Sequence, residues 1–196
     1  MNASTHDYVR RTVYIAPFTA LIPPNDAYNV ATILAPIDDK HTAFHFIAWS
    51  ETEGIDQESW RKFNTAQPGI DVDAGFNNFR TRTNNYGQDR NAMKLGSFTG
   101  IRGIPNQDIV MWETMGPIAD RTRERLGASD LAVVEFRRLM VESALQMRQG
   151  GPAIGTGADH IPHRQIKSYE GVVSKGTDWR VCGSDPQSAP TDIQVA

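Results

Sequence analysis

Alternating and apolar segments in the first fifty residues predict an antiparallel sheet. Residues 9–22 are rich in Val, Tyr, Ile, Phe and Thr and end at two prolines, which predicts a first strand region. Residues 27–35 and 42–50 have the same character, and the polar segment at 36–40 predicts a turn that makes them an antiparallel pair. Both alternate sets of side chains in residues 42–50 are largely apolar. The sheet is therefore expected to be covered on both faces.

Two short helices are expected in the polar middle of the chain. Residues 56–66 predict a helix with Asp56 or Gln57 near its cap, and residues 68–91 follow no period and predict a long irregular connection. Asp108 is expected to cap a second short helix, which ends at Gly116 because glycine and the following proline stop helices.

The longest amphipathic segment lies in the C-terminal half. A helix of about twenty residues is expected to begin at Ser129 or Asp130 and to end at Gly150-Gly151. A strand is expected near residues 166–173 and a polar tail at 184–196. Strands, an irregular middle and then helices predict an α+β fold, an antiparallel sheet packed on one long helix. The stripe of that helix expected to pack in the core is Val133, Phe136, Met140, Ala144 and Met147.

Composition places the chain among ordinary globular proteins. Its 196 residues suit one domain, and a net charge of -3 with no basic block argues against nucleic-acid binding. No apolar run approaches the roughly 18 residues that cross a membrane, and the first residues do not resemble an export signal. The single cysteine, Cys182, excludes an intrachain disulfide and favours a cytoplasmic location.

The histidines do not form an obvious metal site. Asp38, His41 and His45 are the residue types of a two-histidine, one-carboxylate iron site. On a strand, however, these two histidines lie about 13 Å apart at ~3.3 Å per residue, whereas ligands of one metal lie at about 2 Å from it. His160 and His163 are expected in an ordinary loop, and common phosphate, dinucleotide, zinc-protease and serine-nucleophile motifs are absent from the sequence.

The segment from Asn106 to Arg121 carries a resemblance to a known family. With Gln107-Asp108 near its start, it resembles the C-terminal part of the oxygenase α subunits of Rieske non-haem iron enzymes, in particular the phthalate dioxygenase-like branch, which includes aryl-ether O-demethylases. The resemblance covers about residues 10–180. Supporting segments are Pro36-Ile37-Asp38-Asp39, Gln88-Asp89-Arg90, Phe98-Thr99-Gly100-Ile101, Leu126 to Asp130, Ser168 to Val173 and Asp178-Trp179-Arg180.

The resemblance implies a helix-grip (START/SRPBCC-like) fold and a role for Asp108. In that family the catalytic Fe(II) is held by two histidines and one carboxylate, and the carboxylate of the Gln-Asp motif corresponds to Asp108. Asp108 is therefore the expected catalytic residue and metal ligand. The residues expected to line a substrate pocket are Phe44, Phe46, Trp49, Met111, Trp112 and Met115.

Two parts of the family pattern are missing from these 196 residues. A Rieske cluster needs two cysteines and two histidines, and the chain has one cysteine. The family's Asp-x-x-His-x-x-x-x-His motif is also absent, since the run from Asp38 to His45 is one residue short of it. Residues 1–183 are therefore expected to be the C-terminal part of an oxygenase catalytic domain, an incomplete fold that is not active alone and does not carry the Rieske cluster.

Three functions are compatible with this reading. As part of an oxygenase, the chain would work with a Rieske-bearing N-terminal fragment or subunit and a reductase, and would act on an aromatic small molecule by hydroxylation or O-demethylation. A homo-oligomer is compatible with the same family. The alternatives are a helix-grip module that binds a small molecule without catalysis, and a non-functional truncation.

Overall fold

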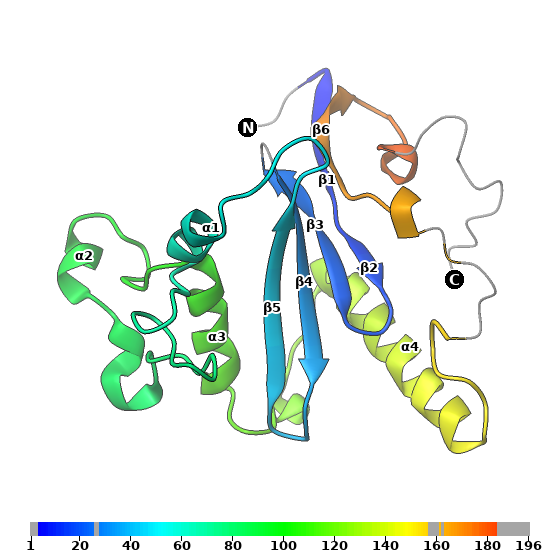
Figure 1. Cartoon of the computed structure of the whole chain (residues 1–196). Helices are drawn as coiled ribbons and strands as arrows, with labels where there is room; N and C mark the ends of the chain where they lie inside the picture. The colour runs from blue at the N-terminus through cyan, green and yellow to red at the C-terminus, as the bar shows by residue number, and fades with distance from the viewer. Residues whose placement is uncertain (1–3, 26–27, 157–160, 162, 184–196) are drawn as a thin grey trace. The chain divides into compact units, whose positions relative to one another are not determined.

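The computed structural model describes residues 4–25, 28–156, 161 and 163–183. They belong to two compact units (Figure 1). Unit 1 consists of residues 1–37, 41–50 and 125–196, and unit 2 of residues 38–40 and 51–124. The tail predicted at residues 184–196 lies outside the described residues. No helix of the described part is long and apolar enough to cross a membrane.

A four-stranded antiparallel sheet forms the centre of unit 1, in the order β2-β3-β4-β5 (Figure 1). In β4 and β5 the register pairs Pro36 with Thr42 at one end and Asn29 with Trp49 at the other, which confirms the predicted antiparallel pair. The turn between them is closed by the Ile37 N–H, which donates to the His41 carbonyl at 2.9 Å. The strands are β2 (Val13–Ile15), β3 (Thr19–Asn25), β4 (Tyr28–Pro36) and β5 (Thr42–Trp49).

The single strand region predicted at residues 9–22 is divided among three strands. β2 and β3 form a hairpin around Pro17, which has no N–H to continue a ladder. The preceding strand, β1 (His6–Arg11), pairs instead with β6 (Tyr169–Ser174) in a separate two-stranded antiparallel sheet. The strand predicted near residues 166–173 is thus confirmed as β6.

The central strands of the sheet bury side chains on one face, whereas one face of the edge strand β5 is exposed. Leu21 and Ala31 face each other across β3 and β4 and are only 8% and 5% exposed. On β5 the side chains of Phe44 and Phe46 are half-buried, but the alternate set is exposed within unit 1: His45, Ile47 and Trp49. The predicted cover is therefore present on one face of the central strands, whereas the opposite face is at most half-buried and includes Leu34, which is 39% exposed.

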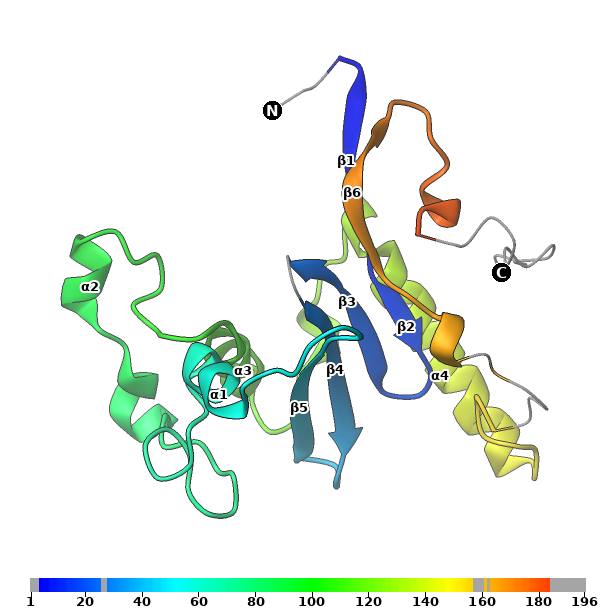
Figure 2. The ribbon, with the colours of Figure 1, turned by 45° about the horizontal axis from the view of Figure 1, so that its top comes forward.

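The long predicted helix is present as α4 (Leu131–Arg148), after a 3-10 turn at Ala128–Asp130, and it passes behind β2 in both views (Figures 1 and 2). The Phe136 ring meets the Tyr14 ring of β2 edge to face, with 5.3 Å between centroids. The Met140 sulfur lies 3.4 Å from the Tyr14 hydroxyl oxygen.

The apolar stripe of α4 does not form the closed core that was predicted. Met140 is half-buried, but the other members of the stripe are exposed within unit 1: Val133, Phe136, Ala144 and Met147. The physical reason is that α4 contacts the sheet at β2. Because β2 has only three residues, it covers only part of the stripe.

Unit 2 contains three helices and the irregular connection. Asp56 caps α1 (Gln57–Asn64), as predicted, by accepting from the Ser59 N–H at 2.7 Å. The connection includes a 3-10 segment at Arg82–Gly87, in which Tyr86 is buried, and leads into the five-residue α2 (Arg90–Lys94). α3 (Ile104–Thr114) lies beside α1 (Figure 2).

The architecture is therefore α+β, with antiparallel sheets and a long helix in the C-terminal half, and it is consistent with a helix-grip catalytic domain. The sheet and the long helix belong to unit 1, whereas Asp108 belongs to unit 2.

The contact between α4 and β2 predicts the effect of shortening Phe136. We expect Phe136→Ala to lower the free energy of unfolding by ~1–2 kcal/mol, less than the 3–5 kcal/mol typical of a buried Phe, because the ring is partly exposed. Val141→Ala on the exposed side of α4 is the matched control, since both changes raise helix propensity, and it should stay within about 0.5 kcal/mol. Urea denaturation measures both, and equal effects would contradict the contact.

Candidate functional site

Asp108 lies inside helix α3 and does not cap it. Gly103 is the N-cap residue, with a φ of 83°, and Pro105 occupies the first turn. Proline favours this position because its missing N–H would have no partner there. The helix consequently begins about one turn earlier than predicted. The prediction that Asp108 is a cap is wrong, and its carboxylate belongs to the second turn.

The start of α3 is held by the side chain of Asn106, which is only 4% exposed. Its Nδ2 donates to the Thr65 hydroxyl at 2.7 Å and to the Arg102 carbonyl at 3.0 Å. Its Oδ1 accepts from Asn78 Nδ2 at 2.6 Å. The Thr65 hydroxyl in turn donates to the same Arg102 carbonyl at 3.0 Å. One amide thus joins the end of α1, the irregular connection and the turn that precedes α3.

The turn before α3 requires glycine at position 103. A Cβ at that position would overlap the Thr65 hydroxyl oxygen and lie 2.7 Å from the Asn64 carbonyl oxygen. The positive φ also favours glycine, because other residues are strained there. Gln107 reinforces this turn through Nε2, which donates to the Ile101 carbonyl at 3.1 Å. The backbone that leads into α3 is therefore tightly determined.

One face of α3 carries Asp108 together with three predicted pocket residues. Met111, Trp112 and Met115 follow Asp108 at spacings of three, four and seven, so they lie on the same face of the helix. The three side chains are 66%, 39% and 49% exposed. Asn106 precedes Asp108 by two residues, which is about 200° around the helix, on the opposite side. The buried side of α3 is thus its anchor, and the exposed side presents a carboxylate among apolar groups.

The Asp108 carboxylate is available as an oxygen donor. Within the described part of the chain it has no hydrogen-bond or ion-pair partner. Partial desolvation raises the pKa of this carboxyl above its ordinary value. A carboxylate of this kind suits one position of a two-histidine, one-carboxylate iron site.

The other predicted pocket residues belong to β5 in unit 1. Phe44 and Phe46 stack with 6.2 Å between ring centroids, on the half-buried face of the strand. Trp49 is on the alternate, exposed face. Their place in a pocket stays a prediction.

The described residues do not contain a complete metal site. Within them, no group of three His, Cys, Asp or Glu side chains is close enough to hold a metal ion. His45 lies on β5 and His41 in the turn before it, as the strand prediction required. His163 begins a 3-10 turn, His160 lies outside the described residues, and Cys182 is buried. The described residues therefore offer Asp108 as a candidate for one metal ligand and do not assemble a full set around it.

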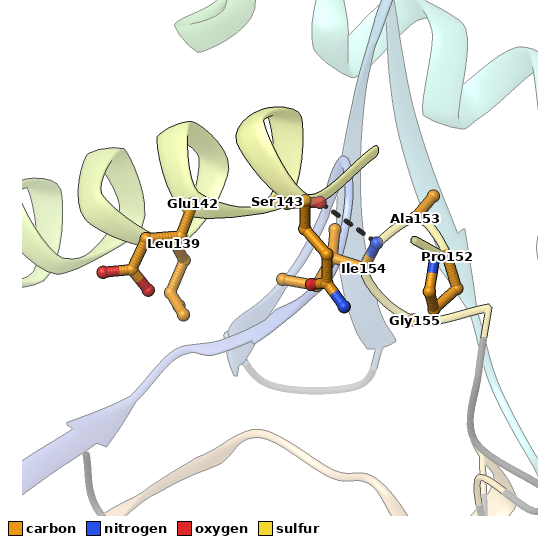
Figure 3. Close-up of a pocket in the computed structure, with 8 residues that line it drawn as sticks. Leu139, Glu142, Ser143, Pro152, Ala153, Ile154 and Gly155 are labelled. Carbon is orange, nitrogen blue, oxygen red and sulfur yellow. Dashed lines mark hydrogen bonds between the residues drawn. The ribbon is translucent and has the colours of Figure 1, made fainter. Parts of the chain in front are cut away.

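A shallow hollow of about 400 Å³ opens in unit 1, between the second half of α4 and the segment after it (Figure 3). The Ser143 hydroxyl accepts there from the Ile154 N–H at 3.1 Å. None of the predicted site residues lines it. The lining consists of Leu139, Glu142, Ser143, Gln146, Pro152, Ala153, Ile154 and Gly155.

Sequence reasoning missed the residues that hold Asp108 in place. Asn106 stood in the quoted motif without a role, and Thr65 and Asn78 were not singled out. The available signal was Gly103 followed by Pro105, which marks a tight turn into a helix. The long-range bonds to residues 65 and 78 have no local signature.

The comparisons with known proteins agree with this architecture. The family model described as "LigXa C-terminal domain like" matches residues 1–194, so the chain belongs to this family. It corresponds to the C-terminal catalytic-domain region of phthalate dioxygenase-like Rieske oxygenase α subunits, which confirms the resemblance.

Two curated relatives are oxygenase subunits. The chain is 58% identical over 180 residues to the phthalate 4,5-dioxygenase oxygenase subunit of Pseudomonas putida, with 91% of the chain and 41% of the relative covered. It is 30% identical over 190 residues to the 3-chlorobenzoate-3,4-dioxygenase oxygenase subunit of Comamonas testosteroni, with 89% and 44% covered. The chain thus spans less than half the length of these relatives.

The raised pKa of Asp108 predicts that its removal stabilises the chain. A carboxyl whose pKa is higher in the folded than in the unfolded state opposes folding once the pH passes its unfolded value. Asp108→Asn should therefore raise the thermal midpoint at about pH 7, and the gain should shrink as the pH falls toward about 4. Scanning calorimetry across this range measures it. A loss of stability at neutral pH would mean that Asp108 has a stabilising partner in solution.

Proposed function

We propose that this chain supplies the carboxylate iron ligand, Asp108, and part of the substrate-binding surface of a ring-hydroxylating oxygenase. The observation that carries the proposal is the exposed face of α3. There the partly desolvated Asp108 carboxylate, which has no partner among the described residues, lies in line with Met111, Trp112 and Met115. A structural helix face of this size would normally bury such side chains or replace them with polar ones.

The iron of this site would take its other protein ligands from outside these 196 residues. Asp108 fits one of the three positions, and the described residues contain no group of three metal-binding side chains. The two histidines and the Rieske cluster would belong to an N-terminal fragment or subunit, and a reductase would deliver electrons. When bound, Fe(II) supplies the activation of O2. The proposed role of Asp108 is to bind the iron at a position defined by α3.

The favoured substrate is an aromatic carboxylate and the favoured reaction is O2-dependent hydroxylation. Both relatives are named for aromatic carboxylates, phthalate and 3-chlorobenzoate. The α3 face supplies what an aromatic ring needs: the Trp112 ring for stacking and two flexible methionines for contact with its edge. O-demethylation uses the same kind of site and would be distinguished by the product.

Iron binding tests the proposal. We expect no stoichiometric Fe(II) binding to the purified chain alone under anaerobic conditions. Binding should occur on mixing with the N-terminal part of the phthalate 4,5-dioxygenase subunit. Asp108→Ala should weaken that binding more than about 100-fold. Glu113→Gln is the matched control, because it removes a carboxylate from another face of α3, keeps an oxygen beside the buried Tyr86 and should retain iron. Bound metal is measured after gel filtration.

Three outcomes would contradict the proposal. Tight iron binding by the chain alone would mean that its own residues complete the site. Iron binding that survives Asp108→Ala would remove the ligand role. Binding of phthalate by the chain without iron or its complement, measured by calorimetry, would favour the small-molecule binding module instead.

A further inference from the structure

We propose that the hydrogen-bonded group of Thr65, Asn78 and Asn106, here the Asn106 cluster, positions the Asp108 carboxylate for iron. This inference rests on the proposed function and adds residues that never touch the metal. Asn106 is a positioning residue, since it acts through the backbone of α3.

The cluster determines the rotation of α3 about its axis. Asn106 projects about 200° away from Asp108, so any rotation that moves one side chain moves the other by the same angle. The Asn106 amide is held by contacts from separate segments, at 2.7 Å from Thr65 and 2.6 Å from Asn78. Since these segments approach from outside the helix, rotation of α3 would break both contacts at once.

The cluster also determines how far α3 extends toward its N-terminus. The Arg102 carbonyl, in the turn before the helix, accepts from both Asn106 and Thr65. Gly103 has no room for a side chain against Thr65. The helix start therefore cannot slide by a residue without leaving buried polar groups unsatisfied, which typically costs about 1–3 kcal/mol per group.

Only an amide satisfies this arrangement fully. Asn106 uses both Nδ2 hydrogens and its carbonyl oxygen, whereas its partners at Thr65 and Arg102 offer acceptors and Asn78 offers a donor. Aspartate would place a carboxylate against two acceptors. Leucine would remove the Asn106 contacts and leave the Asn78 amide without its acceptor, whereas Thr65 and Arg102 would keep only the bond between them. Such a fully used buried amide gives a defined geometry, which is what a metal ligand on the opposite face requires.

The affinity for Fe(II) is measured after mixing the chain with the N-terminal part of the phthalate 4,5-dioxygenase subunit. It distinguishes a positioning role of the cluster from a role in stability alone. We expect Asn106→Leu and Thr65→Val, two changes of similar size that remove hydrogen bonds, to weaken Fe(II) binding by about 10- to 100-fold. Thr65→Ser keeps the hydroxyl and should restore most of the affinity. Ser143→Ala is the stability control, because it removes a buried hydrogen bond from unit 1 and should leave iron affinity unchanged.

A double-mutant cycle with Asp108→Asn measures the coupling of the two positions in Fe(II) affinity. A purely structural role of the cluster would give no such coupling. If the cluster acts through Asp108, Asn106→Leu should weaken Fe(II) binding about 10-fold or more when position 108 is Asp. In the Asp108→Asn background the same change should weaken Fe(II) binding less than about two-fold. Thr65→Val gives the same comparison if Asn106→Leu does not fold. Equal losses in both backgrounds, or unchanged affinity in Thr65→Val, would overturn the positioning role. Unchanged affinity in Asp108→Asn alone would instead overturn the proposed function.

Discussion

The buried amide of Asn106 is the contact on which unit 2 depends. Few apolar side chains are buried in this unit, and among the described residues they are Val72, Tyr86, Ile101 and Pro105. Polar contacts therefore also hold the segments of this unit together. Beside the Asn106 amide, the buried Asp71 carboxylate accepts from Arg80 at 2.8 Å and from the Gln67 N–H at 3.1 Å. Because such groups destabilise a fold when any one partner is lost, they select one arrangement of the irregular connection.

These hydrogen bonds also bear on the proposed role of α3. Hydrogen bonds of Asn106 hold one side of α3, so the other side is not needed to hold the helix in place. Methionine and tryptophan can remain exposed there without loss of the local fold. The partial desolvation of Asp108 disfavours its charged form, so stability alone would not favour a carboxylate at this position.

Local patterns predicted the elements whose partners are close in sequence. The β4–β5 pair followed from two apolar runs around a proline-containing turn, and α4 followed from its period and terminal glycines. β1 was merged with its neighbours because its partner, β6, lies at the far end of the chain. Asp108 was placed at a helix start because its residue type suits a cap, although Pro105 begins α3 earlier. The motif around Gln107-Asp108 identified the family, whereas the Asn106 cluster depends on contacts that no local pattern contains.

The open edge of the four-stranded sheet has a consequence for handling the protein. Among the described residues β5 pairs with β4 on one side only. Its eight residues, TAFHFIAW, include no proline, glycine, acid, lysine or arginine, and Ile47 and Trp49 are exposed. Natural edge strands usually carry such residues as protection against association with other chains. We therefore expect β5 to be one site of association of the isolated chain, and Ile47→Lys to reduce that association.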